Sequence, residues 1–214
     1  YDINKQLKPN CFELKDLNVT FNSEWNSFPM GNVNGYLEGC DDSLKNEVIV
    51  VGAHFDHEGI VTARSTSTEY FSKIYHGADD NASGTSGVIE LARKCSSHKS
   101  QFKRSILFIC FDAEEYGLLG SRYFTQSHLF RNLNVIAMIN IDMIGRLRND
   151  NLILEGIESS RYWKKTIERL NFKYNFVIDN LKSSSGRSDQ KSFLNEGIPA
   201  IHFFTGIHED YHTP

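Results

Sequence analysis

The stretch Val48-Ile-Val-Val-Gly-Ala53 is almost continuously apolar, and three later stretches have the same character. They are Ser105-Ile-Leu-Phe-Ile-Cys-Phe111, Val135-Ile-Ala-Met-Ile-Asn-Ile141 and Ala200-Ile-His-Phe-Phe204. Strands with this composition are buried on both faces, as in the middle of a parallel sheet. The four stretches therefore predict the central strands of one such sheet.

The segments between these strands have the apolar spacing of helices. Because strands and helices alternate along the chain, we expect a three-layer α/β sandwich around a mostly parallel central sheet. The predicted helices cover residues 83–97, 118–130, 159–170 and 189–195.

The N-terminal part has a different pattern, since apolar and polar residues alternate over residues 12–21 and, less regularly, over residues 32–38. Alternation of this kind is typical of antiparallel or edge strands. A length of 214 residues fits one domain with a sizeable core. We therefore expect a single domain over residues 1–214, with the N-terminal strands of residues 1–47 belonging to it.

The bulk composition excludes several classes of protein. The chain has a formal net charge of -4 and no basic stripe, which argues against a nucleic-acid partner. It has no run of 18 apolar residues, so we expect no membrane span. The four cysteines match no Cys-x-x-Cys metal motif and fit one disulfide better than a framework of several.

Charged side chains follow three of the predicted buried strands. The first strand leads into His54 and Asp56, the second into Glu114 and Glu115, and the third into Asp142. Ligands in open α/β sheets collect outside the carboxyl ends of the strands. We therefore expect these residues to meet in one crevice, although they are far apart in the sequence.

Two more segments carry residues of the same kind. Gly77-Ala-Asp79-Asp80-Asn-Ala-Ser-Gly84 precedes a predicted helix, and Tyr211-His212-Thr-Pro214 follows the last predicted strand. Imidazole nitrogens and carboxylate oxygens are ligands that zinc accepts. Two histidines and three acids suit a pair of zinc ions that share one carboxylate, as in many hydrolases. Asp56, two residues after His54, is expected to orient the histidine ring by a hydrogen bond.

Five motifs together resemble the M28 family of zinc aminopeptidases, and especially its bacterial, secreted or envelope members. They occur in the order of the family, within matching context from Gly35 to Pro214. The motifs are Gly52-Ala-His-Phe-Asp56, Gly77-Ala-Asp-Asp-Asn-Ala-Ser-Gly84, Ala113-Glu-Glu-Tyr-Gly-Leu-Leu-Gly-Ser121, Ile141-Asp-Met143 and Tyr211-His-Thr-Pro214. The resemblance implies the phosphorylase/hydrolase-like zinc exopeptidase fold.

The resemblance also implies the zinc ligands of this chain. His54 and Asp142 would serve one ion, Glu115 and His212 the other, and Asp80 would bridge both. Asp79 is implied to be a non-ligand, and a plain helix cap is an equal alternative for it. A non-proline cis peptide bond is implied between Asp80 and Asn81.

The implied reaction is hydrolysis of the N-terminal peptide bond of a peptide substrate by a metal-bound water. Glu114 matches the general base of the family, and Tyr211 is our candidate donor to the oxygen of the tetrahedral intermediate. Ser188-Asp-Gln190 departs from the Ser-Asp-His of many members, which leaves the role of position 190 in substrate binding open.

Other functions stay open at this point. A glutaminyl-cyclase-like acyltransferase shares the fold but uses one zinc ion, and receptor domains on the same fold bind without catalysis. Carboxypeptidase and dipeptidase action also stay open. The resemblance implies a secreted, periplasmic or envelope location after removal of a signal peptide, and the sequence does not give the oligomeric state.

The other histidines are expected to be ordinary surface or core residues, although two of them could line the pocket. These two are His57 and His208, and the remainder are His76, His98, His128 and His202.

Overall fold

The computed structural model describes residues 29–64, 70–181 and 186–214. The predicted strand at residues 12–21 lies outside the described residues. Among the described residues no helix has the length and apolar run that crossing a membrane requires.

The main sheet has seven strands within the described residues, in the order β1-β5-β2-β6-β9-β7-β8. The four predicted central strands lie side by side in it and run parallel to one another, whereas β1 pairs antiparallel with β5 and β7 antiparallel with β9. The fold is therefore an α/β sandwich with a mixed, mostly parallel sheet, as predicted. The strands are β1 Val33–Leu37, β2 Glu47–His54, β5 Ser105–Phe111, β6 Asn134–Ile141, β7 Asn151–Glu155, β8 Val177–Leu181 and β9 Ala200–Phe204.

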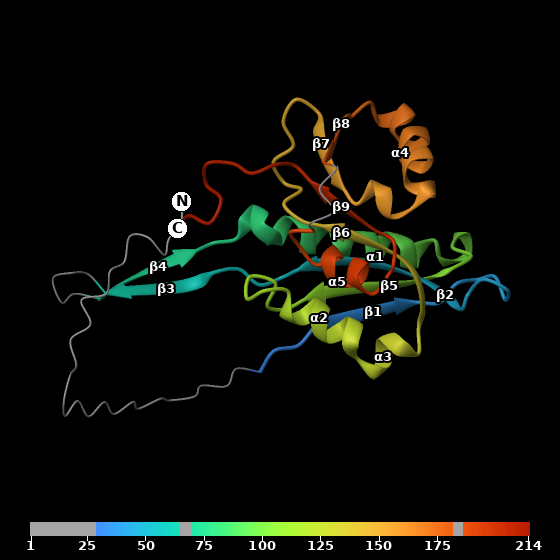
Figure 1. Ribbon diagram of the computed structural model, residues 1–214, viewed down its shortest axis with the longest axis horizontal. Coiled ribbons are helices and arrows are strands. Elements are labelled where there is room, and N and C mark those ends of the chain that lie inside the picture. The colour runs from blue at the N-terminus through green and yellow to red at the C-terminus, as the bar shows by residue number, and fades with distance from the viewer. Residues whose placement is uncertain (1–28, 65–69, 182–185) are drawn as a thin grey trace, which may run out of the picture.

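Helices cover both faces of this sheet, and each central strand divides its apolar side chains between them (Figure 1). On one face, Val50 and Ile109 pack in a core with Phe124 of α2 and Phe193 of α5. On the other face, the core includes Val88 of α1. Burial on both faces explains why the central strands are apolar throughout. The helices are α1 Gly84–Ser97, α2 Leu119–Gln126, α3 His128–Arg131, α4 Arg161–Tyr174 and α5 Gln190–Asn195.

The helix predicted at residues 118–130 is interrupted. Ser127 has an extended backbone with φ -74° and ψ 159°, and its side chain accepts a hydrogen bond from the Phe130 backbone N–H. Serine at such a position caps the start of a new helix, so α2 ends before Ser127 and the short α3 follows it. The two helices remain on the same side of the sheet (Figure 1).

Two features were not predicted from the sequence. The hairpin of β3 Gly59–Arg64 and β4 Tyr70–Tyr75 forms a separate two-stranded sheet that projects from the body of the molecule (Figure 1). At the other end, β7 and β8 extend the main sheet, and α4 packs on them through Trp163 and Ile167.

Candidate active site

Three neighbouring strands end at one edge of the sheet and present the predicted residues there. β2 lies between β5 and β6 and runs parallel to both, so their carboxyl ends are adjacent. His54 is the last residue of β2, Asp142 directly follows β6, and Glu114 and Glu115 follow β5 after two residues. The structure therefore brings these four residues into one crevice.

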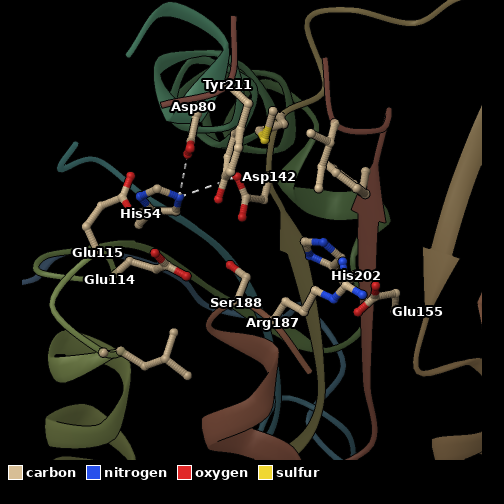
Figure 2. A pocket seen from close by; sticks show the side chains of 15 residues that line it. His54, Asp80, Glu114, Glu115, Asp142, Glu155, Arg187, Ser188, His202 and Tyr211 are labelled. Carbon is tan, nitrogen blue, oxygen red and sulfur yellow. Dashed lines mark ion pairs between the residues drawn. The ribbon is translucent and has the colours of Figure 1, made fainter. Parts of the chain in front are cut away.

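A first group of possible metal ligands surrounds the His54 ring. The Nε2 atom of His54 lies 3.3 Å from Oδ1 of Asp80 and 3.3 Å from Oδ1 of Asp142 (Figure 2). All three residues are buried. Oδ1 of Asp142 is buried without a hydrogen-bond partner in the described residues, which points to a missing binding partner such as a cation.

A second group forms around the His212 ring. The Nε2 atom of His212 lies 3.1 Å from Oδ2 of Asp80 and 3.3 Å from Oε2 of Glu115. Asp80 therefore faces His54 with one carboxylate oxygen and His212 with the other. It joins the two groups in the way that a bridging carboxylate requires.

The segment that carries Asp80 is held in place by its neighbour. Asn81 donates from Nδ2 to the Ile141 carbonyl, and its Oδ1 accepts from the backbone N–H groups of Gly84 and Met143. The peptide bond between Asp80 and Asn81 is cis, as the family resemblance implies. These hydrogen bonds connect the start of α1 to the end of β6 through Asn81, the residue next to Asp80.

Asp79 points away from both groups. Its Oδ1 accepts from the Gly145 backbone N–H at 2.7 Å, and its Oδ2 lies 3.2 Å from Nε2 of His208. Neither α1 nor the preceding turn is capped by a side chain. The simple capping role is therefore wrong for Asp79, which instead binds the loop after β6.

Asp56 contacts both sides of the crevice. Its two carboxylate oxygens accept from the backbone N–H groups of Glu114 and Glu115 at 3.0 and 3.2 Å. Nδ1 of His54 lies 3.1 Å from the Asp56 carbonyl oxygen and 3.6 Å from its Oδ1. The expected contact between Asp56 and the histidine ring is present, and the same residue also fixes the loop after β5.

The donor atoms of the two groups are spaced as zinc ligands would be. Ligands about 2.0–2.1 Å from a tetrahedral zinc ion lie roughly 3.3 Å from one another. The four separations given above, between 3.1 and 3.3 Å, agree with that spacing. The mixed set of imidazole nitrogens and carboxylate oxygens also suits zinc. The residues therefore fit two zinc ions.

The electrostatics of the crevice point the same way. Burial alone would lower the pKa of His54, but the carboxylates of Asp142, Asp56 and Asp80 raise it well above its usual range. The crevice thus strongly favours positive charge at this position, which a metal cation supplies more effectively than a proton on the ring.

Glu114 lies beside the two groups of possible ligands, and the pKa of its carboxyl group is strongly raised. Burial raises its pKa to about 9; the His54 charge lowers it, and the acidic neighbours Asp189, Asp142 and Glu115 add to the rise. A carboxyl group with this pKa is protonated at neutral pH. It therefore needs additional positive charge nearby before it can accept a proton.

The crevice opens into a cavity of ≈ 320 Å³. Figure 2 shows His54, Asp80, Glu114 and Glu115 at one end, and Arg187, His202 and Glu155 at the other. Apolar residues such as Met143, Leu118, Phe204 and Ile207 also line the cavity. The cavity thus has room for a small substrate beside the possible metal ligands.

Tyr211 also lines this cavity and lies next to the second group. Its ring stacks on that of His212, with 3.9 Å between the ring centroids. Burial raises the pKa of Tyr211 to about 12, and the carboxyl groups nearby add to the rise. Its phenol is therefore protonated at neutral pH and able to donate a hydrogen bond.

Position 190 does not line the cavity. Gln190 is fully buried, and its Oε1 lies 3.1 Å from Nδ2 of Asn140. The same Asn140 atom lies 3.1 Å from Nδ1 of His202, which does reach the cavity wall. The departure at Gln190 therefore changes a buried polar network beneath the cavity.

The structure brings together the predicted zinc ligands with Glu114, Asp56 and Tyr211, but not Asp79 or Gln190, and it adds others. His57 lies 2.9 Å from Glu115 and within a cluster with Asp80 and His212, although it was expected to be ordinary or at most to line the pocket. Glu155, to which no sequence motif points, is buried at the far end of the cavity. The only sequence signal for His57 was its position directly after the His54-Phe-Asp56 motif.

Comparisons with known proteins find similarity to aminopeptidases. Leucine aminopeptidase 2 of Trichophyton rubrum is 29% identical over 170 residues, which are 75% of this chain and 31% of the relative. BSAP, a zinc aminopeptidase from Bacillus subtilis, superposes with a TM-score of 0.66 at 28% identity over 86% of this chain and 43% of that one. A glutaminyl cyclase from Bacteroides thetaiotaomicron has a TM-score of 0.60 at 20% identity over 86% of this chain and 75% of that one, which shows a shared fold alone.

This chain spans about a third of the length of the fungal relative. A comparison with family models matches residues 32–214 to the model described as Peptidase family M28. Since this match extends over most of the chain, the chain belongs to peptidase family M28.

Proposed function

We propose that this chain is a zinc-dependent aminopeptidase that removes the N-terminal residue of a peptide. The observation that carries the proposal is the pair of ligand groups that share Asp80 through its two carboxylate oxygens. Aminopeptidase action, rather than carboxypeptidase or dipeptidase action, is supported by the relatives, which are named as aminopeptidases.

In this proposal His54 and Asp142 hold one zinc ion, and Glu115 and His212 hold the other. Zinc at such a centre lowers the pKa of water and polarises a carbonyl group. Asp56 keeps the His54 ring and the two glutamates in position through the hydrogen bonds described above.

Glu114 acts as the general base. It accepts a proton from the attacking water and returns it to the leaving amine, work that is typically worth about 10²–10⁴-fold in rate. Its backbone N–H is fixed by Asp56 at 3.0 Å, so the carboxyl group is presented from a defined loop. Tyr211 lines the same cavity and donates its phenol proton in a hydrogen bond to the developing oxyanion.

The first test replaces Glu114 by glutamine, which keeps the size of the side chain but cannot accept the proton. We expect kcat to fall about 10²–10⁴-fold on aminoacyl p-nitroanilides while the zinc content stays at two ions per chain. Glu168→Gln on the exposed side of α4 is the matched control and should keep full activity. An unchanged kcat in Glu114→Gln would refute the assigned base.

A second test distinguishes the alternatives. An aminopeptidase cleaves leucine p-nitroanilide but not its N-acetylated form, because it requires a free N-terminal amine. A single tightly bound zinc ion, with cyclisation of N-terminal glutamine and no hydrolysis, would favour the glutaminyl-cyclase-like alternative. Zinc binding without either reaction would favour a binding domain.

A further inference from the structure

His57 contacts the second group of possible zinc ligands from a position outside the motif. It follows β2 by three residues, and its Nδ1 atom lies 2.9 Å from Oε1 of Glu115. Its side chain is only 12% exposed. A histidine this close to a possible ligand carboxylate, itself only 10% exposed, could bind the same ion or orient the carboxylate for it.

The two oxygens of Glu115 have different neighbours, which separates these two roles. Oε2 lies 3.3 Å from Nε2 of His212, the spacing of two ligands on one zinc ion. Oε1 lies 2.9 Å from Nδ1 of His57, which is the distance of a hydrogen bond. Nδ1 of His57 is also 3.9 Å from Oδ2 of Asp80, longer than the roughly 3.3 Å between neighbouring ligands of a tetrahedral zinc ion. The geometry therefore favours orientation over ligation.

We propose that His57 is a positioning residue for the second zinc ion, which it serves by donating a hydrogen bond from Nδ1 to Oε1 of Glu115. This bond leaves Oε2 facing Nε2 of His212, 3.3 Å away. The proposal rests on the proposed zinc function but concerns the affinity of one ion rather than the reaction.

His57 also confines the other side chain of this group. Its ring meets that of His212 edge to face, with 5.5 Å between centroids and 79° between planes. The His212 side chain is 30% exposed, whereas that of His54 is 1% exposed. The second group is thus the more open of the two, and it depends more on a neighbour that holds its ligands in place. Loss of such a neighbour typically costs about 10–100-fold in metal affinity.

The test measures zinc affinity on the full chain, stripped of metal and titrated with zinc against a chromophoric chelator. We expect wild type to bind two ions, and His57→Ala to bind one ion as tightly as before and the other about 10–100-fold more weakly. His57→Asn places an amide N–H near the former Nδ1 and should recover most of the lost affinity. His98→Ala removes an exposed histidine on the far end of α1 and is the control.

Each result decides the matter. Two affinities in His57→Ala equal to those of wild type would overturn the positioning role and leave the proposed function intact. An affinity in His57→Asn as low as in His57→Ala would also overturn it, since a direct ligand is not replaced by an amide nitrogen. A wild-type chain that binds no zinc would overturn the proposed function itself, and this inference with it.

Discussion

Replacing His202 by glutamine should make folding stability less sensitive to acid. His202 lies on β9, is 3% exposed, and has Nδ1 against the amide of Asn140. Burial lowers the pKa of His202 from 6.5 to about 4; the positive charge of His54 adds to this, and Asp142 opposes it. The folded protein therefore keeps this ring neutral at a pH where the unfolded chain protonates it.

The sign and size of the effect follow from these two pKa values. Stability from neutral His202 is fully present above pH 6.5 and is lost as the pH falls towards 4, because only the unfolded chain takes up the proton in that interval. The difference between 6.5 and 4, at about 1.4 kcal/mol per pH unit, gives a maximum of about 3 kcal/mol. At pH 5 the loss relative to pH 7 is about 2 kcal/mol.

The assay is urea denaturation of wild type and His202→Gln at pH 7 and pH 5, with chelator present throughout. Between the two pH values wild type should lose about 2 kcal/mol more of its unfolding free energy than the variant. His128→Gln removes an exposed ring on α3 and is the control. Equal losses in wild type and His202→Gln would show that the buried ring does not titrate as argued.

Three further predictions concern packing, the active-site loop and the metal. Phe193→Ala removes a fully buried ring that packs against three other phenylalanine rings, so it should cost about 3–5 kcal/mol in an urea denaturation curve. Gly84→Ala would drive a Cβ atom into the Asn81 side chain and the Ile141 carbonyl, so zinc content by atomic absorption should fall along with thermal stability. Removing zinc from a protein in which free zinc is at 100 times the dissociation constant should cost about 2.7 kcal/mol for each ion bound, and calorimetry should find the midpoint lowered by roughly 5–10 °C per ion.

The centre of the fold was predictable because its strands are covered on both sides. Such strands lack polar residues almost entirely, and the four apolar stretches therefore identified β2, β5, β6 and β9. β7 and β8 were missed for the converse reason. β7 has three consecutive apolar residues between Asn151 and Glu155, and β8 lies at the sheet edge, so pairing with neighbours rather than local sequence determines both.

The sequence predicted those parts of the candidate site that the order and direction of the strands bring together. His54, Glu115 and Asp142 had to meet once their strands were parallel and adjacent, whereas His212 could be identified only through the motif that contains it. Neither strand topology nor a motif could predict the proposed role of His57. It depends on which oxygen of Glu115 turns towards it, and that is fixed by the path of two loops that no sequence spacing encodes.

The crevice also explains why metal binding and proton transfer belong together in this proposal. Burial raises the pKa of Glu114 to about 9, and burial together with Asp80 also raises the pKa of Glu115. A protein without cations would therefore hold Glu114 largely protonated at neutral pH, where it could not act as a base. Positive charge placed between Asp80 and its neighbours favours the ionised form of every carboxyl group around it. The proposed zinc ligands would thus also set the protonation state of Glu114, although Glu114 need not touch the metal.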